Sequence, residues 1–192
     1  MKTFIVAVLI LIGNTSYCQK DNTGPRKVLK DYIKLIDNKK YDQAFDYYRE
    51  DLLKYILKKQ LNKQFAVLDQ MENIEHTVEN SEITYISQVL NEDSLKYCWI
   101  KYTSETHLRL GKSLDKDKSQ GLGDYFKEQY PEDYSFSKSK NKIIIKKRHE
   151  LIAIKDVTWK FLIYTTKLKP FMHLWLPTET MQSLLILKVA HE

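Results

Sequence analysis

The sequence predicts an α+β protein in which three N-terminal helices pack on a curved antiparallel sheet of about five strands, followed by a C-terminal helical extension. Two observations carry this prediction. Apolar residues recur at helical spacing over residues 26–68, whereas from Ile74 onward short runs rich in β-branched and aromatic residues alternate with turn residues. Helices followed by meandering strands are typical of a sheet that carries its helices on one face.

The first residues are typical of a secretory signal. Lys2 gives a positive start, and the apolar run at 4–12 is shorter than the ~20 residues that cross a bilayer. Ser16 and Cys18 are small residues at the two positions that a signal peptidase reads before the cleavage site. We therefore expect residues 1–18 to be a signal peptide, residues 19–192 to form a single domain, and the protein to be exported to the periplasm or outside the cell.

Cys18 also allows a second interpretation, as a lipid-anchored cysteine. A lipobox has a small residue just before the cysteine and usually a leucine three before it, where this chain has Tyr17 and Thr15. We therefore favour soluble export over membrane anchoring. After residues 1–18 only Cys98 remains, which cannot form an internal disulfide, so the fold must rely on packing. Its apolar neighbours predict a buried, unreactive thiol.

The charge of the chain is mildly basic. Lys and Arg number 31 against 25 Asp and Glu, a formal net charge of +6, and the charges are spread along the sequence. This balance permits contact with anionic surfaces without requiring it. The strongest basic cluster runs from Lys138 to Arg148, but isoleucines interleave it, so we interpret it as a solvated sheet edge. Together with export, this speaks against a nucleic-acid partner.

Three helices are expected first. Apolar spacing predicts a helix over 26–36, which the turn residues at 37–40 end. A short second helix is expected over 41–48 and a third over 50–68, with lysines between its apolar positions. Together these helices form one amphipathic layer that can cover a sheet.

The strands begin at residue 74. Two short strands, 74–79 and 83–90, are expected on either side of the turn pair at 80–81, and a turn at 91–93 follows. A long, bent strand is expected over 95–110, where β-branched and aromatic residues are dense.

An insertion at 111–140 interrupts the strands. It is rich in Lys, Asp and Ser, and apolar residues before Pro131 predict a short helix within it. A pure loop of this length is unusual in a compact domain, so we interpret the insertion as a lid or covering element.

The rest of the chain is expected to pack against the last hairpin. A strand over 142–154 turns near Asp156 into a strand over 159–164, in which Trp159 and Phe161 alternate with Lys160 and Leu162. Burying one such aromatic side chain contributes about 1.5–3 kcal/mol. This face of the strand is therefore expected to meet the core.

Residues 165–192 extend beyond this hairpin. A short helix that ends at Pro177 is expected first, and then a last helix over 179–188. The former either closes the open end of the sheet or presents an apolar edge to a partner or a membrane surface. Its apolar side chains are expected to face one way: Phe171, Leu174 and Trp175.

Two parts of the chain show a family resemblance. The segment 37–48 after the opening helix resembles the helix-turn-helix start of the NTF2-like superfamily, and the hairpin into 159–161 is similar to the last strand of that cone-shaped fold. The insertion and the tail are similar to those of a group of exported bacterial proteins without a known activity. The resemblance covers residues 26–164 in outline and implies a pocket between sheet and helices, which some members use for catalysis and others for binding or dimerisation. No residue of a characterised active site matches well enough to be carried over.

Motifs for catalysis or cofactor binding are incomplete. The sequence at 111–113 ends like a phosphate-binding loop, but Thr106 stands where that loop requires glycine. His149-Glu150 begins like a zinc-protease motif, yet Ala153 replaces the second histidine. The five histidines show no metal-ligand spacing. The sequence therefore predicts no metal and no cofactor, and it leans against an enzyme.

Aromatic residues provide the one candidate site. In the expected fold, rings from the helices and from the long strand line a cavity in which a carboxylate or a histidine is the polar group. The simpler interpretation, which we prefer, is that these rings only fill the core. The candidate lining is Tyr32, Tyr48, Tyr55, Tyr97, Trp99, Tyr102, Glu105 and His107.

These observations favour an exported, non-catalytic binding or interaction domain, whose partner is a small apolar molecule or a protein. The alternative is a small enzyme of the isomerase, dehydratase or cyclase type that acts in the pocket. An ionisable side chain pointing into the pocket beside a second polar group would distinguish them, because proton transfer needs hydrogen-bond reach. A third hypothesis is a homodimer through the outer face of the sheet, which exposed apolar residues on that face would support.

Overall fold

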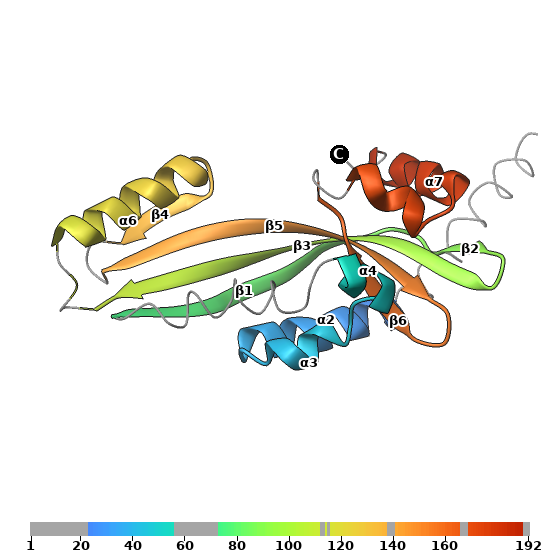
Figure 1. Cartoon of the computed structure of the whole chain (residues 1–192), viewed down its shortest axis with the longest axis horizontal. Coiled ribbons are helices and arrows are strands. Elements are labelled where there is room, and N and C mark those ends of the chain that lie inside the picture. Colours follow the sequence, from blue (N-terminus) through green and yellow to red (C-terminus); the bar gives the residue numbers. More distant parts are fainter. Residues whose placement is uncertain are drawn as a thin grey trace, which may run out of the picture.

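The computed structural model of the chain describes residues 23–55, 73–111, 114, 116–137, 141–165 and 169–189. Within them, six strands form one antiparallel sheet, accompanied by five α-helices and a 3-10 helix (Figure 1). The α+β class expected from the sequence is confirmed. The expected signal peptide lies outside these residues.

Two long strands, β3 and β5, form the centre of the sheet and pair with each other along most of their length. The short strands complete the edges: β1 and β2 pair with the far edge of β3, and β4 and β6 pair with the far edge of β5. No described strand pairs with that edge of β5 between residues 146 and 150. The strands are β1 (Ile74–Ile86), β2 (Leu90–Glu92), β3 (Leu95–Leu110), β4 (Tyr134–Ser137), β5 (Lys142–Lys155) and β6 (Trp159–Ile163).

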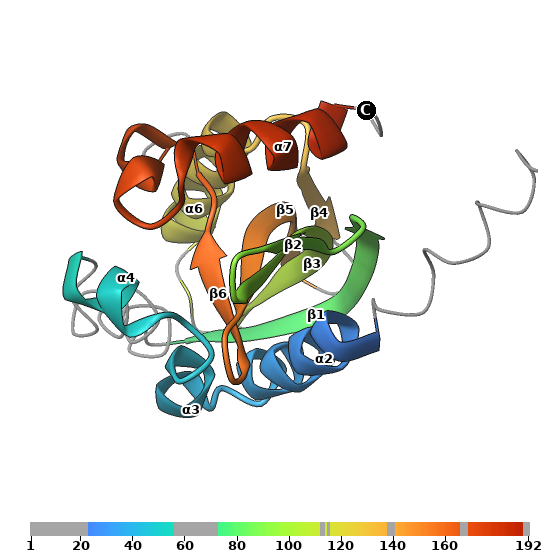
Figure 2. The same cartoon turned by 90° about the vertical axis from the view of Figure 1, so that its right-hand side faces the viewer.

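Helices lie on both faces of the sheet, which corrects the expectation that they share one face. Figures 1 and 2 show α2 and α3 on one side of the sheet and α7 on the other. The chain crosses to the second face after β6, and four apolar residues of its tail are buried there: Met172, Trp175, Leu176 and Leu184. The helices are α2 (Thr23–Asp37), α3 (Tyr41–Phe45), α4 (Glu50–Tyr55), α6 (Lys116–Gln129), the 3-10 helix η3 (Lys169–Leu174) and α7 (Thr178–Val189).

Most expected elements are present with small changes of boundary. The first two helices, the helix within the insertion, the long strand and the last hairpin are all confirmed. The insertion also contains β4, which was not expected, and apolar residues of α6 pack on a small core cluster around Ile143 and Ile145. The expected third helix is described only as far as Tyr55, and its remainder lies outside the described residues.

β1 is one continuous strand, although a turn at Asn80-Ser81 was expected. The register shifts between Glu79, which pairs with Glu105, and Glu82, which pairs with Thr103, so one extra residue is accommodated as a bulge. Asn80 has a φ of 50°, in the left-handed region that asparagine tolerates. Turns and bulges both use such residues, so local sequence does not separate them. The next turn lies at residues 93–94 and overlaps the expected turn at 91–93 only at Asp93, which has a φ of 52°. The expected strand over 83–90 is divided, because β1 ends at Ile86 and β2 spans Leu90–Glu92.

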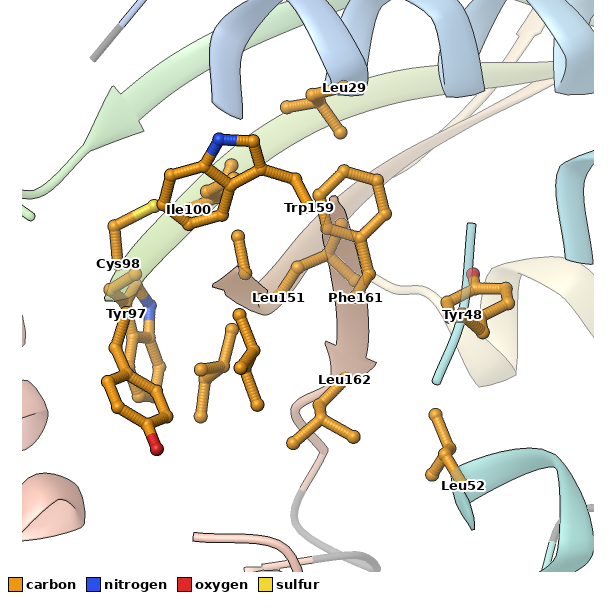
Figure 3. Packing of buried hydrophobic residues seen from close by; sticks show 14 of the residues in the cluster. Leu29, Tyr48, Leu52, Tyr97, Cys98, Ile100, Leu151, Trp159, Phe161 and Leu162 are labelled. Carbon is orange, nitrogen blue, oxygen red and sulfur yellow. The ribbon is translucent and has the colours of Figure 1, made fainter. Parts of the chain in front are cut away.

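The final strand carries its tryptophan inward, as expected. Trp159 is 8% exposed and Phe161 is fully buried, and Figure 3 shows both side chains beneath Leu29 of α2. Gly24 permits this close approach, because a Cβ there would lie 2.8 Å from the Nε1 atom of Trp159. The ring of Tyr32 packs edge-on against Phe161 with centroids 5.7 Å apart. The α2–β6 contact therefore closes one side of the core.

The C-terminal extension closes the other side. Met172, Trp175 and Leu184 are buried in the main core cluster, so η3 and α7 are packing elements. Leu174 is 46% exposed, so the expectation that it faces the same way as Trp175 is wrong. Neighbouring residues on so tight a helix point in different directions. The side chain of Phe171 lies outside the described residues.

Two further expectations concern the chain as a whole. Cys98 is buried, and burial raises the pKa of its thiol to about 12, as expected for an unreactive cysteine. Among the helices that the structure describes, none is long and apolar enough to cross a membrane.

The role of η3 as a packing element predicts opposite outcomes for two adjacent residues. Trp175→Ala removes a buried indole and should lower the free energy of unfolding by about 3–5 kcal/mol. Leu174→Ala changes a largely exposed side chain and should stay within about 0.5 kcal/mol of the wild type. Urea unfolding followed by circular dichroism measures both. Equal losses would mean that η3 is not docked as described.

Candidate functional site

A pocket of about 280 Å³ lies between the helices α2 and α3 and the face of β3 and β5 that they cover. Alternate residues of a strand point to the same face, so the side chains of Tyr102, Ser104 and Thr106 share this face of β3. The register pairs Tyr102 with His149 and Ser104 with Lys147. Residues directly opposite each other lie on the same face, so His149 and Lys147 also belong to the pocket wall.

Three tyrosines lie together at the pocket. The hydroxyl oxygens of Tyr32 and Tyr48 are 2.6 Å apart, and Tyr102 lines the same pocket. All three side chains are buried, and burial raises the pKa of each phenol above its usual value. They are therefore neutral at physiological pH. The cluster offers hydroxyl groups that donate and accept hydrogen bonds within an otherwise aromatic wall.

His149 is fixed in place by its neighbours. Its ring stacks on Tyr102 with centroids 4.3 Å apart and an angle of 10° between the planes, and its Nε2 atom lies 2.8 Å from the Oγ atom of Ser104. Burial, with a smaller contribution from the charge of Lys147, lowers the pKa of His149 from 6.5 to about 4. The imidazole is therefore neutral at pH 7.

Lys147 is one of the basic residues that line the pocket. Its Nζ atom lies 5.8 Å from the ring centroid of Tyr130, and burial lowers the pKa of the ammonium. The next residue, Arg148, points to the opposite face, where its exposed side chain pairs with Asp133 at 3.3 Å. Asp37 lies at the rim, accepts a hydrogen bond from Ser81, and has its pKa raised by partial burial.

Only part of the lining expected from the sequence is brought together here. Tyr32, Tyr48 and Tyr102 line the pocket, whereas Tyr97 and Trp99 do not. The alternation along β3 explains the difference, because odd-numbered and even-numbered residues of this strand point to opposite faces. Trp99 packs under α7, where the Nζ atom of Lys188 lies 5.1 Å from its ring centroid. The side chain of Tyr55 lies outside the described residues.

The expected polar groups of the pocket also lie on the outer face. His107 is buried between two carboxylates, with its Nδ1 atom 2.9 Å from Glu79 and its Nε2 atom 2.9 Å from Glu105. Glu79 and Glu105 are opposite each other in the register of β1 and β3. Glu105 and His107 therefore belong to a cluster of close polar contacts on the outer face of the sheet and are not among the residues that line the pocket.

The polar residues that do line the pocket were missed by sequence reasoning. His149 was set aside with an incomplete zinc motif, and Lys147 was assigned to a solvated edge. The helices α2 and α3 cover the face of β5 that carries these two residues, although no described strand pairs with the edge of β5 at 146–150. The available signal was the alternation of Lys147, His149 and Leu151 with Lys146, Arg148 and Glu150, combined with the pairing of β5 to β3.

Comparison of the chain with protein-family models, curated proteins and solved structures gave no match. Across the residues with described positions, no group of three or more histidine, cysteine or acidic side chains is arranged to hold a metal ion. The geometry of the pocket is therefore the basis for assigning a function.

The environment of His149 predicts a specific dependence of stability on pH. Its pKa is lower in the folded state than in the unfolded chain, so the unfolded chain binds more protons between pH 6.5 and about 4. The stabilisation is complete above pH 6.5 and is lost as the pH falls towards 4. Between pH 7 and 4 the wild type should lose on the order of 2 kcal/mol more than His149→Gln, which cannot titrate.

Urea unfolding of both proteins at the two pH values measures this difference. The glutamine variant is a matched control, because its amide can still form a hydrogen bond with the Ser104 hydroxyl. Parallel losses in the two proteins would contradict the described burial of His149.

Proposed function

We propose that this chain is a non-catalytic binding protein that holds a small molecule in the pocket between α2, α3 and the β3–β5 face. The observation that carries this proposal is the combination of apolar walls with a few convergent polar groups. Ile33 and Ile36 of α2 supply aliphatic surface, while Ser104, Lys147 and His149 supply polar atoms on the sheet side. Small-molecule sites in proteins have this composition.

The volume of the pocket limits the size of the ligand. At about 280 Å³ it is nearly twice the ~150 Å³ of a cavity that takes up benzene. A single ring with a short substituent, or a short hydrocarbon chain, is a suitable size.

Two further parts of the proposal, export and membership of a family, rest on the sequence. The apolar segment at 4–12 supports action in the periplasm or outside the cell. A pocket between sheet and helices supports kinship with the NTF2-like superfamily, whereas α7 on the opposite face departs from the expected arrangement. The hypothesis of a homodimer through the outer face of the sheet has less support. On that face, the side chains of β3 beyond Tyr102 are polar: Thr103, Glu105, His107 and Arg109.

The second candidate function is a small enzyme acting in the same pocket. One observation favours it, namely the 2.8 Å contact between Ser104 Oγ and His149 Nε2 beside the tyrosine hydroxyls. A catalytic base works best with a pKa near the working pH, and the pKa of His149 is about 4. The raised pKa values of Tyr32, Tyr48 and Tyr102 make these phenols weaker acids. Both effects favour binding over proton transfer.

Binding in the pocket is tested with indole, a neutral aromatic probe of suitable size. Ile36→Trp places a bulky ring in the pocket wall and should abolish the saturation-transfer NMR signal of indole. Asp31→Trp adds the same ring at an exposed position of α2 outside this pocket and should leave the signal unchanged. Equal signals from both variants, or no signal from the wild type, would contradict the proposal. Thermal melting confirms that each variant is folded.

A further inference from the structure

Lys147 differs from the other charged residues at the pocket in having no carboxylate partner among the described residues. Arg148 pairs with Asp133, and Glu150 accepts a hydrogen bond from Lys188 at 2.9 Å on the opposite face. Asp37, at the rim, interacts with Ser81, and no ion pair joins it to Lys147. The ammonium of Lys147 is therefore the one positive charge of the described lining that remains available to a ligand.

The surroundings of Lys147 make this charge costly without a ligand. A partly buried ammonium loses hydration, and only a paired charge or a hydrogen bond offsets that loss. The ring of Tyr130, 5.8 Å from the Nζ atom, compensates only in part. The lowered pKa of Lys147 is a second sign of the same desolvation. An anionic group of a ligand would pair with the ammonium and offset part of the lost hydration.

Hydroxyl donors lie on the same face as this ammonium. Ser104 is directly opposite Lys147 in the register, and Thr106 follows on the same face of β3. An ammonium with neighbouring hydroxyls can bind anionic oxygens by charge-assisted hydrogen bonds. The stacked rings of Tyr102 and His149 lie next along the two strands and offer a flat surface to the body of a ligand.

We propose that the ligand of this pocket is a small organic carboxylate whose anionic group contacts Lys147 and whose ring or hydrocarbon body lies against Tyr102, His149 and Ile36. This inference rests on the proposed function and specifies the class of ligand. A carboxylate matches the site better than a phosphate does. One ammonium supplies a single charge, while Arg148 is directed to the other face and His149 is neutral at pH 7.

The experiment compares phenylacetate with its neutral analogue phenylacetamide by isothermal titration calorimetry at neutral pH. The wild type should bind the carboxylate about tenfold more tightly than the amide. Lys147→Met should reduce the affinity for phenylacetate to that for the amide and leave the amide unaffected. Lys146→Met removes the same charge from the adjacent residue, which points to the outer face opposite Glu105, and should change neither affinity.

The possible outcomes separate the two proposals. The carboxylate assignment would be overturned if the wild type bound the two probes with equal affinity, or if the Lys146 and Lys147 substitutions had equal effects. Binding of the amide would still support the pocket as a binding site. Tighter binding of phenyl phosphate than of phenylacetate would also overturn it. Failure of both phenylacetate and phenylacetamide, together with failure of indole, would instead refute the proposed function. Lys147→Gln replaces the methionine variant if circular dichroism shows the latter to be unfolded.

Discussion

The register between β3 and β5 is the constraint on which the rest of the structure depends. The two strands pair without a break from Lys96 opposite Lys155 to Arg109 opposite Lys142. Side chains alternate between faces along each strand, so a slip of one strand by one residue would exchange its two faces. The observed register places Lys147 and His149 in the pocket wall and turns Arg148 and Glu150 to the other side. Both the chemistry of the pocket and its single available charge follow from this pairing.

Packing on both faces holds this register in place. The run Leu151–Ile154 of β5 is buried throughout, because α2 and α3 cover one face of the sheet while η3 and α7 cover the other (Figure 2). A slip would move these residues against different neighbours and would break the hairpin with β6. Near the start of β5, around Ile143 and Ile145, apolar residues of α6 cover only one face of the strand. The pocket lies between these two packed regions, where polar side chains replace the apolar core.

Local patterns in the sequence were sufficient for most elements and insufficient for the site. The density of β-branched and aromatic residues predicted β3 with its observed bounds, and the alternation after Asp156 predicted β6 and its buried tryptophan. The unbroken apolar run in β5 signals burial on both faces, and this signal could have predicted helices on both sides. The site depended on long-range pairing, because Ser104 and His149 are 45 positions apart in the sequence. Grouping Trp99 with Tyr102 failed because the two residues differ in parity along one strand.

The most direct test of the β3–β5 register is the nuclear Overhauser contact between the rings of Tyr102 and His149. The two rings are stacked with centroids 4.3 Å apart, so we predict strong cross-peaks between their protons. Cross-peaks of the Tyr102 ring with the side chains of Arg148 or Glu150 would place the register off by one residue. That result would move Lys147 to the outer face and contradict the pocket described for this protein.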